Sequence, residues 1–174
     1  MKRSQAGLTQ IYTGDGKGKS TAAFGLAVRA AGSGRKVCIY QFIKGYTCGE
    51  HKALRKLGKI KIELCGRGCF IKEKPGLKDV ERAVRGFERA RATINSGKYD
   101  IVILDEINVA MGTGLLKIAD VLSAIREKPA FVELVLTGRR CPKSLLAEAD
   151  LVTEMRKIKH PFDRGIIARR GIEY

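Results

Sequence analysis

Acidic and aromatic residues are scarce in this sequence, and tryptophan is absent. Only 18 Asp and Glu stand against 34 Lys and Arg, so the formal net charge is +16, and aromatic residues make up 6% of the chain. Such an excess of positive charge favours a nucleic-acid binder, a protein of the membrane surface, or an enzyme with a strongly anionic substrate. A basic surface of solvated Lys and Arg side chains, with no such partner, is the alternative interpretation.

Long apolar runs are also missing. No stretch approaches the roughly 20 apolar residues that a membrane-spanning helix needs, and the basic start of the chain has too short an apolar part for a secretory signal. We therefore expect a cytoplasmic protein without a membrane partner. The length of 174 residues suits one domain of ordinary size, and we treat residues 1–174 as that domain.

Cysteine and histidine form no recognisable cluster. There is no C-x-x-C pair, and the number of cysteines is odd, so neither a zinc site nor a disulfide framework is expected. The two histidines stand alone and are interpreted as surface or structural residues. The residues concerned are Cys38, Cys48, Cys65, Cys69, Cys141, His51 and His160.

Strand-like and helix-like segments alternate along the chain. This alternation predicts an α/β fold, with a mostly parallel sheet and helices on both faces. In such sheets, ligands bind at the carboxyl ends of the strands. The predicted strands are residues 8–13, 36–43, 59–65, 101–105, 131–137 and 151–155, and the predicted helices are residues 19–31, 50–57, 77–94, 118–125 and 144–149.

A glycine-rich loop stands between the first predicted strand and the first predicted helix. Residues 13–20 read TGDGKGKS, in which Gly18, Lys19 and Ser20 match the phosphate-loop pattern G-x-x-x-x-G-K-[S/T] and Thr13 replaces its first glycine. Glycines let the backbone wrap with its N–H groups toward a phosphate, and the helix N-terminus adds positive potential. A glycine-rich turn with a coincidental GKS is the alternative, which the flanking strand and helix disfavour.

This loop predicts both a catalytic cation and the nucleotide contacts. Lys19 would supply positive charge to phosphate oxygens, Lys17 adds a second cation that suits a triphosphate, and the Ser20 hydroxyl is placed to bind Mg²⁺. The predicted ATP-binding residues are Thr13, Gly14, Asp15, Gly16, Lys17, Gly18, Lys19, Ser20 and Thr21.

An acidic pair ends the most apolar of the predicted strands. Residues 101–105 read IVILD, an unbroken run typical of a strand buried on both sides, and Glu106 follows. Asp105 and Glu106 would hold a metal ion directly or through water, and we expect Glu106 to be catalytic together with Lys19. A solvated acidic turn is the alternative, but the pair follows the phosphate loop in the order that a nucleotide site requires.

Three other predicted strands end in glycine next to a basic residue. Lys44, Arg67 and Arg139 follow the second, third and fifth strands, and each stands beside a glycine. Because the carboxyl ends of parallel strands meet at one edge, we expect these side chains to form a basic rim around a large anionic ligand.

Taken in order, these motifs resemble one known family. The segments TGDGKGKSTAAFG (13–25), QFIKG (41–45), LDEIN (104–108) and LTGR (136–139) are similar to those of the ATP:corrinoid adenosyltransferases of the CobA/BtuR type. The most specific likeness comes late in the chain, where ADLVTEM (149–155) is followed by KHPFD (159–163). The resemblance runs from about residue 8 to residue 174.

The resemblance implies a RecA-like P-loop fold, a homodimer and an activity. That activity is transfer of the 5′-deoxyadenosyl group of ATP to the Co(I) centre of a reduced corrinoid, with release of triphosphate and with Mg²⁺ or Mn²⁺ as the metal. The ATP lies reversed in the loop in this family, and a flavoprotein reductant is an expected partner. The implied corrinoid-binding residues are Phe42, Lys44, Arg67, Gly68, Cys69, Phe70 and Arg139.

One departure from the family pattern lies after the third predicted strand, and two other functions are alternatives. Family members often carry an aromatic pair after the third strand, whereas this chain has only Phe70 there. A RecA-like ATPase that binds nucleic acid is the main alternative, but no basic strand face with interleaved aromatic residues supports it, so no nucleic-acid partner is expected. A small P-loop kinase would need a substrate lid and an acceptor site, and the sequence indicates neither.

Overall fold

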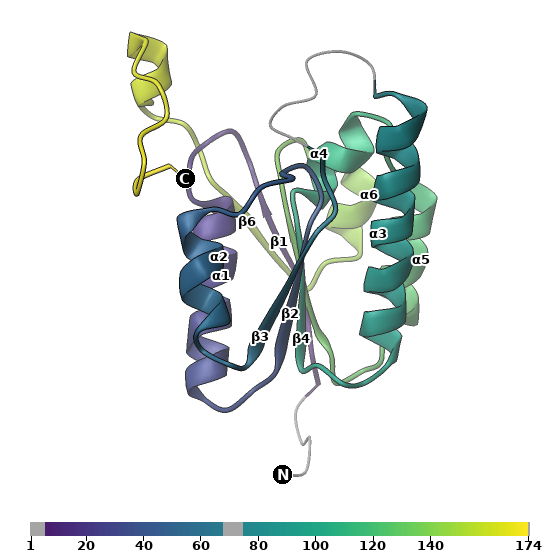
Figure 1. The fold of residues 1–174 in the computed structure, drawn as a ribbon. Coiled ribbons are helices and arrows are strands. Elements are labelled where there is room, and N and C mark those ends of the chain that lie inside the picture. The colour runs from purple at the N-terminus through teal and green to yellow at the C-terminus, as the bar shows by residue number, and fades with distance from the viewer. Residues whose placement is uncertain (1–5, 68–74, 174) are drawn as a thin grey trace.

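Six parallel strands form one sheet in the computed structural model, which describes residues 6–67 and 75–173 (Figure 1). The spatial order is β3-β2-β4-β5-β1-β6, and the neighbouring strands pair in parallel throughout. This confirms the predicted parallel α/β sheet. The strands are β1 (Thr9–Thr13), β2 (Val37–Gln41), β3 (Ile60–Leu64), β4 (Ile101–Asp105), β5 (Glu133–Thr137) and β6 (Leu151–Glu154).

Helices cover both faces of the sheet, as expected (Figure 1). Two of them, α1 and α2, lie on one face, and the other four lie on the opposite face. A 3₁₀ turn, η1 (Pro161–Arg164), follows β6. The helices are α1 (Lys19–Gly32), α2 (Gly49–Arg55), α3 (Leu77–Asn95), α4 (Ile107–Gly112), α5 (Ile118–Glu127) and α6 (Lys143–Ala147).

Helix α4 was not predicted from the sequence. It has only six residues, INVAMG, and begins directly after the acidic end of β4. A run this short is below the length at which a helical period can be recognised. The fold therefore turns immediately from a fully buried strand into a helix, and this turn sets the position of Glu106.

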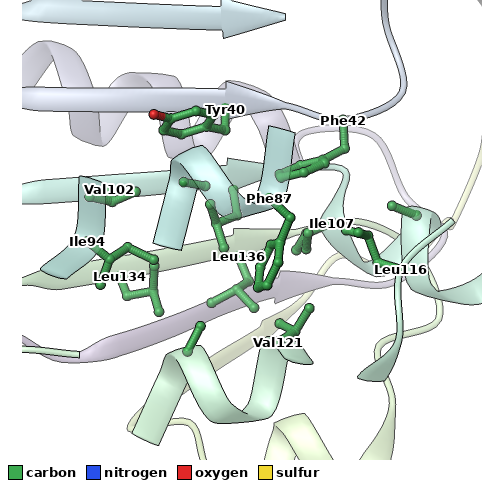
Figure 2. Packing of buried hydrophobic residues seen from close by; sticks show 14 of the residues in the cluster. Tyr40, Phe42, Phe87, Ile94, Val102, Ile107, Leu116, Val121, Leu134 and Leu136 are labelled. Carbon is green, nitrogen blue, oxygen red and sulfur yellow. The ribbon is translucent and has the colours of Figure 1, made fainter. Parts of the chain in front are cut away.

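The two faces of the central strands bury different cores. On β2 and β4, Ile39 and Ile103 pack toward α1, whereas Tyr40 and Leu104 pack toward α3. Figure 2 shows the second of these cores, with Phe87 of α3 among the side chains from the sheet. All five residues of β4 are buried, which confirms the prediction of a strand covered on both sides.

The edge strand β3 and the outer face of α3 carry charges that pair with one another. Lys61 of β3 is exposed between two buried isoleucines, as the alternating sequence predicts. Glu63 of β3 accepts a hydrogen bond from Arg89 of α3 at 3.1 Å, and Arg85 lies 3.5 Å from Glu81 one turn away. Some of the arginines are therefore paired with acids on an outer surface.

His51 is a structural residue within α2. Its side chain is fully buried, and its Nδ1 accepts a hydrogen bond from the backbone N–H of Cys48 at 3.0 Å, which caps the start of the helix. Burial lowers the pKa of this imidazole.

Among the described residues, every helix is too short or too polar to span a bilayer.

Gly86 of α3 and Gly25 of α1 give opposite expectations for the same substitution. A Cβ on Gly86 would stand 2.7 Å from the Cβ of Cys65, whereas a Cβ on Gly25 would meet no described atom within 4 Å. We expect Gly86→Ala to lower the free energy of unfolding by about 1–3 kcal/mol through overpacking. Gly25→Ala should raise it by up to about 1 kcal/mol through helix propensity. Urea unfolding followed by circular dichroism measures both, and equal effects would contradict this packing of α3.

Candidate nucleotide site

A cavity of about 700 Å³ opens at the carboxyl end of the sheet. Its walls come from the loop after β1, from α1 and α2, from the ends of β2, β4 and β5, and from the segment that follows β6. Figure 1 shows this last segment, in yellow, beyond the strand ends on the side of α1 and α2. The sequence placed the ligand at this edge, and the cavity lies there.

The phosphate loop needs its glycines because another part of the chain packs against it. Gly14 has a φ of +93°, and a Cβ at this position would lie 2.5 Å from the carbonyl oxygen of Met155. A Cβ on Gly16 would lie 2.7 Å from the same oxygen, which accepts the Gly16 N–H at 2.6 Å. The chain leaving β6 therefore supports the loop from behind. Gly18, at a φ of +123°, precedes the first residue of α1.

Thr13, which replaces the first glycine of the motif, is the last residue of β1. Its hydroxyl accepts a hydrogen bond from the Cys141 N–H at 3.3 Å and so ties the phosphate loop to the loop after β5. Asp15 is exposed and lies 4.0 Å from Arg139, which lines the cavity.

Lys19 is held inside the loop with its ammonium group at the cavity. Its Nζ donates hydrogen bonds to the carbonyl oxygens of Gly14 at 2.8 Å and Gly16 at 2.7 Å, while the residue is only 7% exposed. Burial lowers the pKa of this ammonium, and the carboxylate of Glu106 opposes that shift. Two of three donor hydrogens are used in this way, so the third can reach an anion in the cavity.

The carboxylate of Asp105 is fully buried at the end of β4. Its Oδ2 accepts a hydrogen bond from Gln41 Nε2 at 2.8 Å, and its Oδ1 accepts one from Thr137 Oγ1 at 2.7 Å. Thr137 Oγ1 in turn accepts the backbone N–H of Glu106 at 2.9 Å. One buried carboxylate thus ties together the ends of β2, β4 and β5, and its side chain does not line the cavity.

Glu106 is the acidic residue of the pair that lines the cavity. Its φ of 59° is in the left-handed region, which is uncommon for a residue with a side chain and costs about 1–3 kcal/mol. Burial raises the pKa of its carboxyl group, and the neighbouring Asp105 charge adds to this rise. The hydrogen bond to Thr137 holds the strained backbone in place.

The predicted basic rim is only partly assembled around this cavity. Lys44 and Arg139 line it, whereas Arg67 faces another surface and pairs with Asp79 at 3.4 Å. Phe42 is 1% exposed and packs against Phe87 in the core (Figure 2). Three further predicted corrinoid-binding residues, Gly68, Cys69 and Phe70, lie outside the described residues.

The oxygen atoms around the cavity suit a hard divalent cation. The Ser20 hydroxyl and the Glu106 carboxylate line the same space, and Mg²⁺ prefers such ligands together with phosphate oxygens and water. Within residues 6–67 and 75–173, no three His, Cys, Asp or Glu side chains cluster to form a protein-only metal site. A metal here would depend on the nucleotide for several of its ligands.

Sequence reasoning missed two groups of residues that the structure brings to the site. Gln41 and Thr137 are polar residues at the very end of apolar strands, a signal that could have marked them as partners of Asp105. His160 and residues 171–173 reach the cavity from the segment after β6. No local pattern in the sequence indicates that this distant segment returns to the phosphate loop.

A phosphate loop at the start of α1 and an acidic residue at the end of β4, on one parallel sheet, define a P-loop nucleotide-binding protein. Its fold resembles that of the flagellar accessory protein FlaH from Methanocaldococcus jannaschii, with a TM-score of 0.57 over 86% of this chain and 71% of that chain. Since the two share 15% identity, this likeness concerns the fold, which is RecA-like.

Sequence comparison identifies the family. Residues 5–174 match the profile described as ATP:corrinoid adenosyltransferase BtuR/CobO/CobP, and the chain belongs to this family. A corrinoid adenosyltransferase of Sinorhizobium sp is 38% identical over 177 residues, which covers 99% of this chain and 83% of that protein. One from Escherichia coli is 35% identical over 173 residues, covering 99% and 88%.

The hydrogen bonds of the Thr137 hydroxyl can be tested separately from the size of the side chain. Thr137→Val keeps the branched side chain but leaves the Asp105 Oδ1 and the Glu106 N–H without this partner. We expect the free energy of unfolding to fall by about 2–4 kcal/mol, because buried polar groups lose their hydrogen bonds. Thr137→Ser should retain most of the stability in urea unfolding. A valine variant as stable as the parent protein would contradict the role given to this hydroxyl.

Proposed function

We propose that this chain transfers the 5′-deoxyadenosyl group of ATP to the Co(I) centre of a reduced corrinoid and releases triphosphate. Membership of the adenosyltransferase family supports this, and so does the cavity in which a phosphate loop, a buried lysine and a carboxylate face one another. The observation that carries the proposal is the buried Lys19 ammonium, held by the loop carbonyls at the floor of this cavity.

The reaction requires the protein to position its two substrates and to supply positive charge. It requires no nucleophile from the protein. The cobalt of the substrate attacks C5′, the C5′–O5′ bond breaks, and the electron pair leaves on the oxygen of triphosphate, while Co(I) becomes formally Co(III). Lys19, Lys17 and the N-terminus of α1 would stabilise the charge that grows on this leaving group. The surrounding walls would align the cobalt with the carbon atom.

Mg²⁺ or Mn²⁺ is proposed as the metal, held by Ser20 and Glu106 together with phosphate oxygens. When bound, the metal would neutralise part of the triphosphate charge. Asp105 would act on the metal indirectly, because both of its carboxylate oxygens already accept hydrogen bonds from Gln41 and Thr137. It would keep the backbone of Glu106 in place, and so it would act on the metal through its neighbour.

The corrinoid would meet the cavity at its basic side. Lys44 and Arg139 are proposed to contact its anionic groups, since both line the cavity. For Arg67, Phe42 and residues 68–70, the corrinoid contact stays a prediction from the family resemblance.

Several further properties are proposed on the same basis. All six strands join one sheet, which supports a single nucleotide-binding domain over residues 1–174. Ile158, Phe162 and Ile167 are more than 70% exposed, and such apolar side chains suit the surface of a homodimer. Because Co(I) must be generated by reduction, a flavoprotein reductant is proposed as a partner, and a cytoplasmic location fits this chemistry.

The identity of the phosphate product tests the proposal against a conventional ATPase. With ATP, Mg²⁺ and a chemically reduced corrinoid, we expect the absorption spectrum of the adenosylcorrinoid to appear together with an equal amount of triphosphate. Ion chromatography distinguishes triphosphate from ADP and phosphate. Formation of ADP without adenosylcorrinoid, or turnover stimulated by DNA or RNA, would instead favour the nucleic-acid-binding ATPase.

Lys19→Ala should reduce adenosyl transfer about 10²- to 10³-fold, because one donor to the developing negative charge is lost. The rate of adenosylcorrinoid formation at saturating corrinoid and variable ATP measures this loss. Lys98→Ala is the matched control, since it removes the same charge from an exposed position just before β4, at the opposite end of the sheet. Full activity of Lys19→Ala would refute the site.

A further inference from the structure

The segment after β6 returns to the phosphate loop and forms part of the cavity. Gly171, Ile172 and Glu173 line the same space as Lys17 and Lys19, although more than 150 positions separate them in the sequence. Lys17 Nζ donates to the carbonyl oxygen of Ile172 at 3.2 Å and to Glu173 Oε1 at 3.0 Å. The second cation of the phosphate loop is therefore engaged by a carboxylate of the protein itself.

Glu173 is held in this position from its own segment. Its Oε2 accepts the backbone N–H of Arg169 at 2.7 Å, and the Arg169 guanidinium lies 3.1 Å from its Oε1. These hydrogen bonds from Arg169, together with the one from Lys17, lower the pKa of Glu173 to about 2. The side chain is therefore an anion at neutral pH, and it is held in hydrogen-bond contact with Lys17.

We propose that the Glu173 carboxylate competes with the triphosphate group of the ligand for Lys17, and that triphosphate binding displaces this ion pair. The inference rests on the proposed function in one respect, namely that the phosphates lie in the loop. Two anions that meet one ammonium group repel each other, so the carboxylate weakens the hold on the phosphates. Release of triphosphate is then assisted when Glu173 recaptures Lys17.

The expected size of this effect is modest. The side chains of Lys17 and Glu173 are 47% and 23% exposed, and ion pairs between side chains this exposed are weak. Loss of the competing carboxylate should therefore tighten triphosphate binding about two- to fivefold.

Titration calorimetry with inorganic triphosphate and Mg²⁺ tests this without any corrinoid or turnover. In the full chain, Glu173→Gln should bind triphosphate about two- to fivefold more tightly than the parent protein. Asp163→Asn is the matched control, because Asp163 lies in the same segment and pairs with Lys157 at 2.9 Å away from the loop cations. It should bind triphosphate as the parent protein does, and thermal unfolding checks that each variant is folded.

The same substitution made in the Lys17→Ala variant separates competition for Lys17 from a general change of charge. Glu173→Gln also releases Arg169, whose freed guanidinium would attract triphosphate by itself. In Lys17→Ala, which should bind more weakly, adding Glu173→Gln should bring little further change. An undiminished gain in that background, or unchanged or weaker binding by Glu173→Gln alone, would overturn the inference.

The same titrations distinguish failure of this inference from failure of the proposed function. If the parent protein binds triphosphate and Lys19→Ala abolishes that binding while Glu173→Gln changes nothing, the inference fails and the proposed site stands. If the parent protein does not bind triphosphate at all, both fail together.

Discussion

The buried carboxylate of Asp105 is the constraint on which the site depends. A charge at this depth is tolerated only when its oxygens are hydrogen-bonded, and Gln41 and Thr137 meet that need from the two strands on either side of β4. The same Thr137 hydroxyl accepts the Glu106 N–H and so sustains a left-handed backbone beside the cavity. Burial of one acid thereby aligns three strand ends and presents the next acid to the ligand.

The phosphate loop shows a second dependence, on a segment that is distant in sequence. Besides the positive φ of Gly14 and Gly18, the Met155 carbonyl oxygen requires glycine here, because it would lie within 3 Å of any Cβ on Gly14 or Gly16. The same chain then continues to Glu173 at Lys17. The strand β6 and the residues after it are therefore part of the site, both as its support and as one of its walls.

The strongly basic composition separates into two parts in the structure. Outside the site, several arginines pair with acids on helix surfaces, as Arg91 does with Glu127 and Arg126 with Glu148. Around the cavity, Lys17, Lys19, Lys44 and Arg139 face one space. That arrangement suits a compact polyanion such as a triphosphate.

The sequence by itself determined the sheet, the order of its elements, the phosphate loop and the acid after β4, because these follow from local period and short motifs. Tertiary structure alone decided that Phe42 belongs to the core and that Arg67 faces another surface. It also decided that Asp105 is buried and hydrogen-bonded, whereas Glu106 lines the cavity. It also decided that Glu173 meets Lys17. These outcomes depend on contacts between strand ends and segments up to 156 positions apart, and no local pattern encodes such contacts.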